Sequence, residues 1–252
     1  MSTSIIPHQL QPGEVRVSFF DAEAHGGLDA TMWAQLVGWL QPDERERLNR
    51  FKNLESRASF LIGRGMVRRL LADITDVPPP AWRFVEGVRG RPEIGEPATR
   101  LRFNLAHSGG MVACVMADDR DVGIDVEHLD RRQLSFDVAA RSCAPDEIDD
   151  INAEPAEGRQ QRFLAYWTLK EAYLKARSLG ISVHLPDVSF VLDVERPALV
   201  LRGSMADADP RWLMRIVQAS SRHLLAVAAH HPEGDEPKIG FRRFRPEFFQ
   251  AP

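Results

Sequence analysis

Three carboxylates and one lysine, in two short segments of the chain, could together bind a metal ion and a phosphate group. Asp125 and Glu127 are two residues apart in an apolar run that is typical of a β-strand, so both side chains point to one face. Glu171 and Lys175 are four residues apart in a helix-like run, which places them on one stripe with Trp167. Hard divalent cations prefer oxygen ligands, and they also bind phosphate oxygens. If the two segments fold together, they predict a divalent-cation site that holds a phosphate.

Each of these residues also has an ordinary structural explanation. The two strand acids alone could be solvated residues on an exposed strand, and Glu171 with Lys175 could form a surface ion pair. The apolar residues that alternate with the strand acids, and the presence of the second segment, argue against the first explanation. For Glu171 and Lys175 the sequence alone favours the surface ion pair, and the metal site stays open at this point. Lys170 points to another part of the helix, where we expect an ion-pair or structural role. For Trp167 we expect packing rather than chemistry.

The composition is typical of a globular protein and argues against several classes of function. The 252 residues fit one compact body or two half-size subdomains that share a core. The formal net charge is −4, from 32 basic and 36 acidic residues, which gives no overall attraction to nucleic acid. Cys114 and Cys143 have neither metal nor disulfide spacing, so we expect free thiols in a reducing cytoplasm. Without a signal peptide or a bilayer-length apolar run, we expect a cytoplasmic protein that is not in the membrane.

The hydrophobic pattern predicts strands and helices that would position the two segments. Strands are expected at Glu14–Phe20, Leu101–Leu105, Met111–Ala117, the run with the two acids, Val188–Val191, Leu199–Arg202 and Leu224–Ala229. Helices are expected at Thr31–Leu40, from Gln41, at Leu54–Ile74, at Phe136–Ser142, from Pro145, and at Gln160–Ser178. The strand–turn–strand order from Leu101 to Glu127 suggests an antiparallel hairpin. The last long helix should bury Tyr166, Leu169, Tyr173 and Ala176. The two halves offer similar elements without a clear sequence repeat.

Several motifs together resemble the phosphopantetheinyl transferases of the surfactin-synthetase-activating (Sfp) type. They occur in the family's order and spacing, and they are Gly90–Pro92, Phe103–Ser108, Gly123–Glu127 and Trp167–Ala176. Weaker support comes from Gln41–Phe51, Arg57–Leu71 and Gly180–Ser182. The pair GIDVE and WTLKEAYLKA is highly specific, whereas either half alone would be moderate evidence. The resemblance runs from about residue 41 to residue 190, which is most of the chain.

The resemblance implies a reaction, its participants and a fold. Members of the family move the phosphopantetheine arm of coenzyme A onto a serine of an acyl or peptidyl carrier protein, use Mg2+, and release adenosine 3′,5′-bisphosphate. Members of this length have an α+β (α/β) pseudo-dimeric fold of two similar subdomains, with the active site between them. We therefore expect a subdomain at 13–117 on the coenzyme A nucleotide side and one at 118–232 with the carboxylates and catalytic helix. A C-terminal tail at 233–252 would follow, and such pseudo-dimers usually act as monomers.

The resemblance also assigns roles to the residues that opened this section. Asp125, Glu127 and Glu171 are expected to bind Mg2+. Either Glu171 or a metal-bound water would take the proton of the carrier serine, because a serine hydroxyl is a poor nucleophile until its proton has somewhere to go. Lys175 would hold a pyrophosphate oxygen and offset charge on the leaving bisphosphate.

Residues in the first half of the chain are implied to bind coenzyme A. Arg47 and Arg91 would bind the 3′-phosphate and the adenine end, because the arginine fork donates two parallel hydrogen bonds to phosphate. Gly90 would let the backbone approach the base closely, and His107 would contact a phosphate. The family often has serine before this histidine, and Ala106 here removes that hydroxyl. Further candidates are Asn104 and Ser108 and, with less support, Arg57, Arg64, Arg68 and Arg69.

Two other functions compete with a transferase. A metal-dependent nuclease also uses carboxylates and lysine, but such sites often place the acid and lysine two apart on a strand, and here His128 and Leu129 follow Glu127. A non-catalytic module that binds coenzyme A or a carrier would not need all three carboxylates and the lysine. Carrier proteins are generally acidic, so Arg131–Arg132, or Arg242, Arg243 and Arg245, could form a docking face. Carriers of fatty acid, polyketide and nonribosomal peptide biosynthesis fit equally well.

Overall fold

The chain folds into two compact units, each with its own sheet and core. The computed structural model describes residues 8–130, 136–180, 183–192, 196–232 and 236–250. The first unit comprises Met1–Asp119 together with Lys238–Pro252, and the second comprises Arg120–Pro237. Two segments named above, Arg131–Arg132 and Ile181–Ser182, lie outside the described residues. In the described part of the chain, no helix has the length and hydropathy needed to cross a membrane.

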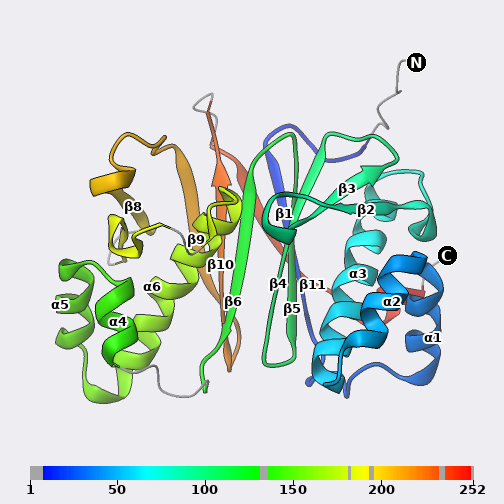
Figure 1. The fold of residues 1–252 in the computed structure, drawn as a ribbon, viewed down its shortest axis with the longest axis horizontal. Coiled ribbons are helices and arrows are strands. Elements are labelled where there is room, and N and C mark those ends of the chain that lie inside the picture. Colours follow the sequence, from blue (N-terminus) through cyan, green and yellow to red (C-terminus); the bar gives the residue numbers. More distant parts are fainter. Residues whose placement is uncertain (1–7, 131–135, 181–182, 193–195, 233–235, 251–252) are drawn as a thin grey trace. The chain divides into compact units, whose positions relative to one another are not determined.

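The first unit places its helices against a four-stranded sheet in the order β11-β1-β5-β4, and it adds the small hairpin β2-β3 (Figure 1). Strands β1 and β5, and β4 and β5, are antiparallel. The elements are β1 (Glu14–Asp21), α1 (Ala30–Trp39), α2 (Pro42–Arg50), α3 (Leu54–Ile74), β2 (Arg83–Glu86), β3 (Pro92–Glu96), β4 (Leu101–Ser108), β5 (Met111–Asp118), β11 (Lys238–Arg243) and α7 (Glu247–Gln250).

The second unit has a three-stranded sheet in the order β6-β10-β9 and a separate hairpin, β7-β8. Helix α6 packs across this sheet, with most of its strand contacts on β6 and β10 (Figure 1). The elements are β6 (Val122–His128), α4 (Phe136–Ser142), α5 (Pro145–Ala153), α6 (Ala156–Ala176), β7 (Val188–Val191), β8 (Ala198–Leu201), β9 (Trp212–Ser220) and β10 (His223–His230).

The two units repeat one order of elements, which confirms the prediction of two similar subdomains. A strand is followed by three helices, a small hairpin and two further strands, as β1 to β5 in the first unit and β6 to β10 in the second. Strand β1 pairs antiparallel with β5, and β5 also pairs with β4. In the same way β6 pairs antiparallel with β10, and β10 also pairs with β9. Helices α2 and α5 both have 9 residues, and α3 and α6 both have 21.

A buried ion pair occurs at the same place in both units. Helices α2 and α5 both begin with Pro-Asp-Glu, and their glutamates, Glu44 and Glu147, accept hydrogen bonds from the backbone N–H groups of Gln41 (3.0 Å) and Ala144 (2.8 Å). Glu44 pairs with Arg68 at 2.5 Å, and Glu147 pairs with Lys170 at 2.7 Å. Each basic residue is the fifteenth of its long helix, counted from Leu54 or Ala156. The duplication is therefore visible in topology and in these pairs, although the sequences have diverged.

Several sequence-based expectations need correction. Strands β4 and β5 form the expected antiparallel hairpin, but β6 pairs with β10 in a different sheet. The predicted strands near Val188 and Leu199 form their own hairpin, and the sheet is completed by β9, which the prediction missed. Helix α6 begins at Ala156, four residues before the predicted Gln160.

The C-terminal segment is part of the first unit's fold rather than a tail on the surface. Strand β11 pairs in parallel with β1, and α7 follows it. The side chains of Phe244 and Phe249 are buried in the core of the first unit, with 1% and 0% exposure. The sequence around β11 gave only a weak strand signal, because three of its six residues are basic and only Ile239 and Phe241 are apolar.

Helix α6 approaches β6 so closely that one position of the strand must be glycine. A Cβ atom on Gly123 would lie 2.1 Å from the carbonyl oxygen of Ala172 and 2.4 Å from the backbone nitrogen of Ala176. Backbone atoms cannot move aside as a flexible side chain can. The same face of the sheet carries Ala226 and Ala228 on β10, both fully buried, which also keeps the helix close. Asp125 follows Gly123 on this face, so the glycine sets the distance between that acid and the helix.

We expect Phe244→Ala to lower the free energy of unfolding by about 3–5 kcal/mol, because it removes a fully buried ring from the first core. Urea denaturation followed by circular dichroism measures this loss. The matched control is Phe241→Ala, at a side chain that is 38% exposed on β11, where the change should stay within about 0.5 kcal/mol. Equal effects of the two substitutions would contradict the assignment of the C-terminal segment to the core.

We expect Gly123→Ala to destabilise the protein by about 1–3 kcal/mol, because α6 must move away from β6 to admit the methyl group. The control is Gly38→Ala in α1, where a Cβ atom meets nothing within 4 Å and the change should be neutral or stabilising. Urea denaturation compares the two variants, and hydrogen exchange of the α6 amides reports the displaced helix. A Gly123→Ala protein as stable as the parent would contradict the close packing.

Candidate active site

Both faces of β6 are buried, so its acids are not solvated residues on an exposed strand. The apolar face consists of Val122, Ile124 and Val126, as the alternation predicted, and all three are buried. On the opposite face Asp125 is 6% exposed and Glu127 is 5% exposed. Burying carboxylates is costly unless they are paired or bind a cation. The strand therefore carries two acids whose burial requires a compensating interaction.

Helix α6 supplies that interaction from the stripe that the sequence predicted. The ammonium of Lys175 donates to Oδ1 of Asp125 at 2.5 Å. About two helical turns away, the indole N–H of Trp167 donates to Oε1 of Glu127 at 3.0 Å. Glu171 lies between Trp167 and Lys175 on the same stripe, one turn from each. The two contacts therefore bracket the third carboxylate and bring the strand and helix motifs together. The expected core stripe, with Tyr166, Leu169, Tyr173 and Ala176, is buried on another side of the helix.

The electrostatics of the cluster confirm that the three acids are neighbours. Burial raises the pKa of Asp125 to about 7, against the attraction of Lys175, and the charges of Glu127 and Glu171 raise it further. Burial also raises the pKa of Glu171, which Lys175 lowers and Glu127 raises. The three carboxylates carry more negative charge than the single ammonium of Lys175 can offset. Their surroundings therefore favour a cation in addition to Lys175.

The residues fit a hard divalent cation by their chemistry, although they are not preset as ligands. Oδ2 of Asp125 is buried and has no hydrogen-bond partner, and carboxylate oxygens are the ligands that Mg2+ and Ca2+ prefer. Within the described residues, no three His, Cys, Asp or Glu side chains are already spaced to hold a metal ion. The contacts of Lys175 with Asp125 and of Trp167 with Glu127 use one oxygen of each acid. Cation binding therefore requires side-chain adjustments at the three carboxylates.

Lys170 has a structural role, as the sequence predicted. Its side chain is 1% exposed, and its ammonium pairs with Glu147 and donates to the carbonyl oxygen of Leu185 at 3.1 Å. Glu147 also accepts the backbone N–H of Phe190 at 2.9 Å. One buried ion pair thus joins α5, α6 and β7, and it supports the helix that carries Glu171.

A pocket in the first unit gathers several of the predicted coenzyme A residues. It has a volume of ≈ 260 Å³ and lies between the helices α2 and α3, the strands β4 and β5, and the segment around Gly90. Arg47, Gly90 and His107 line it. The apolar part of its wall includes Phe51, Phe60, Leu105 and Val112. Arginine, a glycine and aromatic rings around one pocket suit a nucleotide with its phosphate.

Three other predicted residues lie outside this lining. Arg91 donates to the carbonyl oxygen of Phe103 at 2.8 Å, which ties β3 to β4. Asn104 is buried within β4, and Ser108 is the last residue of that strand. Neither Arg91, Asn104 nor Ser108 is among the residues that line the pocket.

Four arginines of α3 had less support from the sequence as coenzyme A ligands, and of these Arg64 lines the pocket. The other three, Arg57, Arg68 and Arg69, do not. Arg64 is 9% exposed, its Nη1 is buried without a hydrogen-bond partner, and its Nε pairs with Glu44 at 3.3 Å. Burial lowers its pKa to about 10, Glu44 opposes this, and Arg68 and Arg47 lower it further. The guanidinium groups of Arg64 and Arg47 both lie within 5.6 Å of the centre of the Phe60 ring. Two arginines at one pocket are suited by charge and geometry to attract an anion.

The other arginines of this helix have structural partners. Arg68 is fully buried and pairs with Glu44. Arg69 pairs with Asp73 at 2.6 Å, and Arg57 lies over the ring of Trp33. The sequence could not separate these roles, because the four arginines are similar in type and the helix presents them to different neighbours.

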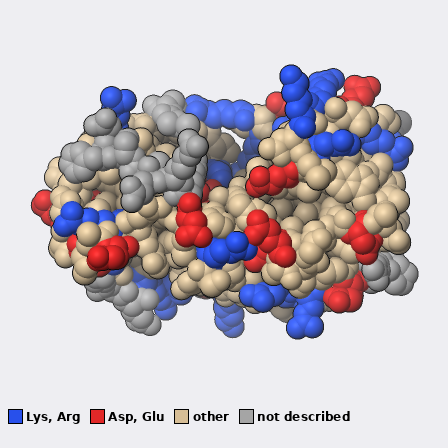
Figure 2. Space-filling view, turned by 90° about the horizontal axis from the view of Figure 1, so that it is seen from below, with Lys and Arg blue, Asp and Glu red and all other residues tan. Residues whose placement is uncertain are grey.

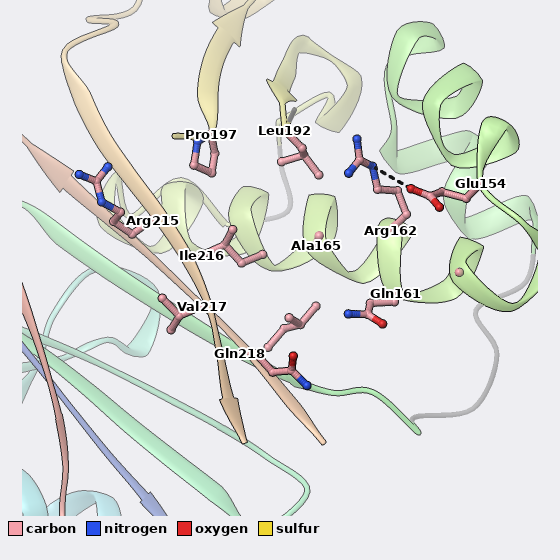
Figure 3. Close-up of a pocket in the computed structure, with 12 residues that line it drawn as sticks. Glu154, Gln161, Arg162, Ala165, Leu192, Pro197, Arg215, Ile216, Val217 and Gln218 are labelled. Atoms are coloured by element: carbon pink, nitrogen blue, oxygen red, sulfur yellow. Dashed lines mark ion pairs between the residues drawn. The ribbon is translucent and has the colours of Figure 1, made fainter. Parts of the chain in front are cut away.

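A larger pocket in the second unit contains none of the three carboxylates. It has a volume of ≈ 530 Å³ and lies between α6 and β9, where Gln161, Arg162 and Ala165 face Ile216 and Gln218 (Figure 3). Arg162 pairs there with Glu154, so its charge is already offset. The predicted catalytic residues Asp125, Glu171 and Lys175 therefore lie outside the lining of this pocket.

Acidic and basic side chains are intermixed on the face of the molecule in Figure 2, as the small net charge suggests. Among the described residues on this face, the intermixed charges do not form the continuous basic track that a nuclease would present to its substrate.

Comparison with known proteins identifies the family. The model of the 4′-phosphopantetheinyl transferase superfamily matches residues 121–228, and the model of the N-terminal part of 4′-phosphopantetheinyl transferases matches residues 29–119. The 4′-phosphopantetheinyl transferase HetI of Nostoc sp. is 36% identical over 195 residues, which are 77% of this chain and 79% of HetI. The phosphopantetheinyl transferase of Thraustochytrium sp. is 33% identical over 231 residues, 85% of this chain and 79% of that one. The transferase Sfp of Bacillus subtilis is 25% identical over 202 residues, 80% of this chain and 87% of Sfp. The protein therefore belongs to the 4′-phosphopantetheinyl transferase superfamily and is an enzyme of that class.

Proposed function

We propose that this enzyme transfers the 4′-phosphopantetheine arm of coenzyme A to a serine of an apo acyl or peptidyl carrier protein, with Mg2+ at the carboxylates of the second unit. The serine oxygen forms a bond to the β-phosphorus of coenzyme A, and the bond from that phosphorus to the bridging oxygen breaks. Adenosine 3′,5′-bisphosphate leaves with the bond's electrons. The observation that carries this proposal is the buried cluster of Asp125, Glu127 and Glu171 with Lys175.

Asp125, Glu127 and Glu171 would hold the cation. The buried, unpartnered oxygen of Asp125 and the raised pKa values of Asp125 and Glu171 support this assignment, because a cation would relieve the mutual repulsion of the three acids. When bound, Mg2+ supplies positive charge to the diphosphate oxygens at which negative charge develops.

Lys175 would bind a diphosphate oxygen beside the cation. Its ammonium already lies in the acidic cluster at 2.5 Å from Asp125, so it can share its donors with an incoming phosphate. An ammonium also offsets the charge that grows on the leaving bisphosphate. The side chain of Lys175 is 32% exposed, compared with 8% for the side chain of Asp125, so Lys175 is the more accessible partner of the pair.

Glu171 would accept the proton of the attacking serine. Burial raises its pKa, and a base works best when its pKa approaches the operating pH. Its position between Trp167 and Lys175 places it on the stripe that faces the two strand acids. We assign Glu171 to both proton acceptance and cation binding.

Arg47 and Arg64 would bind the 3′-phosphate of coenzyme A in the pocket of the first unit. The two guanidinium groups lie beside the same phenyl ring, and Nη1 of Arg64 has a donor without a partner. Glu44 neutralises only part of the local charge, because it pairs with Arg64 and Arg68 together. A phosphate dianion would satisfy both the unpaired donor and the repulsion between the arginines.

We expect Glu171→Gln to slow transfer by about 10²-fold or more, because it removes the proton acceptor and a cation ligand. The assay incubates the enzyme with coenzyme A, Mg2+ and several purified apo-carriers, and intact mass spectrometry reports the added arm. The control is Glu157→Gln in the first turn of α6, which makes the same change at an exposed residue. Near-normal turnover by a folded Glu171→Gln enzyme would remove Glu171 from this role.

The same assay separates the competing functions. Binding of coenzyme A without mass gain on any carrier would support a non-catalytic module. Cleavage of plasmid DNA that needs Mg2+ and is lost in Asp125→Ala would support a nuclease.

We expect Arg64→Met to raise the KM for coenzyme A about tenfold while leaving the KM for 3′-dephospho-coenzyme A nearly unchanged, because only the former carries the phosphate that Arg64 would bind. The control is Arg69→Met on the same helix, whose guanidinium pairs with Asp73 outside the pocket. Steady-state kinetics with both substrates measures the difference. An equal rise of both KM values would show that Arg64 does not contact the 3′-phosphate.

A further inference from the structure

The indole of Trp167 links the helix of the cluster to one of its strand acids. Its N–H donates to Oε1 of Glu127 at 3.0 Å, across 40 residues of sequence. The sequence suggested only a packing role for this residue. Its ring does pack, since the Phe163 ring lies 6.2 Å away at an interplanar angle of 29°. Because the ring is packed, the direction in which its N–H points is also restricted.

We propose that Trp167 is a positioning residue that sets both the affinity of the carboxylate cluster for its cation and its preference for Mg2+ over Ca2+. This inference rests on the proposed function, in which Glu127 is a ligand. Groups that hydrogen-bond to metal ligands orient them, and their loss typically weakens metal binding by about 10–100-fold.

The chemistry of an indole suits this task. Its nitrogen is a donor only, so it can hold a carboxylate but cannot compete for the cation as a ligand. Two χ angles and the contact with Phe163 restrict the ring. Glu127 has three rotatable side-chain bonds, so a fixed donor narrows the range of orientations of its carboxylate. The indole therefore helps to set the direction in which the oxygens of Glu127 point.

This hydrogen bond is one of two contacts that hold α6 and β6 together at the carboxylate cluster. The Lys175–Asp125 contact joins α6 to β6 on one side of Glu171, and the Trp167–Glu127 contact joins them on the other. Both ends of the site are thus held by side chains of α6, and the helix ligand lies between them.

A restricted carboxylate discriminates between the two common hard cations. Mg2+ requires near-ideal octahedral geometry with oxygens at about 2.0–2.1 Å, whereas Ca2+ accepts six to eight oxygens in flexible arrangements. A carboxylate that is free to turn can adapt to Ca2+ by offering both oxygens. Because the indole holds Oε1 of Glu127, it hinders that adaptation and favours Mg2+.

The test uses the full-length enzyme with coenzyme A and no carrier, and Mn2+ as a paramagnetic probe read by electron paramagnetic resonance. We expect Trp167→Phe to weaken Mn2+ binding about tenfold or more. Competition with Mg2+ and Ca2+ should show a reduced preference for Mg2+. The control is Trp212→Phe, which loses an indole hydrogen bond to the carbonyl oxygen of Asp209 (3.0 Å) in the same unit. The control should bind Mn2+ as the parent does.

A double-mutant cycle with Glu127→Gln shows whether Trp167 acts through Glu127. We expect Glu127→Gln alone to weaken Mn2+ binding, and Trp167→Phe to add little in that background. If Trp167→Phe unfolds the protein, benzothienylalanine at position 167 keeps the two-ring shape and removes only the N–H.

The outcomes distinguish this inference from the proposed function. Parent-like Mn2+ affinity and cation preference in Trp167→Phe would overturn the inference and leave the ligand set intact. An equal loss in the parent and in Glu127→Gln would also overturn it, because Trp167 would then act by another route. Parent-like affinity in Glu127→Gln would remove Glu127 from the ligand set and overturn the inference with it, whereas the role of Glu171 is decided separately by transfer in Glu171→Gln.

Discussion

The arrangement of the candidate active site depends on how closely helix α6 can approach strand β6. The glycine at position 123, which has no side chain, allows that close approach. At Gly123 the backbone of α6 comes within the space that a Cβ atom would need. Two residues further along the strand, Asp125 reaches Lys175, and four residues further Glu127 reaches Trp167. Asp125 is short and the indole of Trp167 is rigid, so each contact depends on the distance between the helix and the strand. The first residue of the GIDVE motif is therefore structural, and it sets the distance at which the two acids face α6.

One fold is used twice in this chain, with different chemistry in each copy. Counted from the first residue of each long helix, Trp167, Glu171 and Lys175 are the twelfth, sixteenth and twentieth residues of α6. The same positions of α3 are Gly65, Arg69 and Asp73. In α3 the basic residue, Arg69, comes before the acidic one, Asp73, whereas in α6 Glu171 comes before Lys175. Arg69 and Asp73 form an ion pair, so the first copy has no carboxylate cluster at that place.

The first copy presents cationic groups in its pocket instead. What both copies retain is the buried pair between the glutamate that caps a 9-residue helix and a basic residue of the 21-residue helix. The retained pair maintains the scaffold, whereas the residues that differ give the first unit a pocket with two arginines and the second unit a carboxylate cluster.

Sequence reasoning succeeded where the signal is local and failed where a residue's role depends on distant partners. The bounds of α3, the buried stripe of α6 and the shared face of the two strand acids follow from periodicity within one element. Strand β11 was missed because its stability comes from pairing with β1, more than 200 residues away in sequence. The sequence does not distinguish Arg64 from the other arginines of α3, or Trp167 from a packing residue of α6. Their contacts with Glu44 and Phe60, and with Glu127, appear only in the folded structure.

The parallel pairing of the last strand with the first one has a consequence for how the protein is made. Residues 120–237, which form the second unit, leave the ribosome before β11 exists. The first unit begins to emerge earlier, but it lacks an edge strand and two core phenylalanines until residues 238–249 have been made. The second unit can therefore complete its fold during synthesis before the first unit does. A newly made chain of this kind completes the unit with the carboxylate cluster before the unit with the arginine-lined pocket.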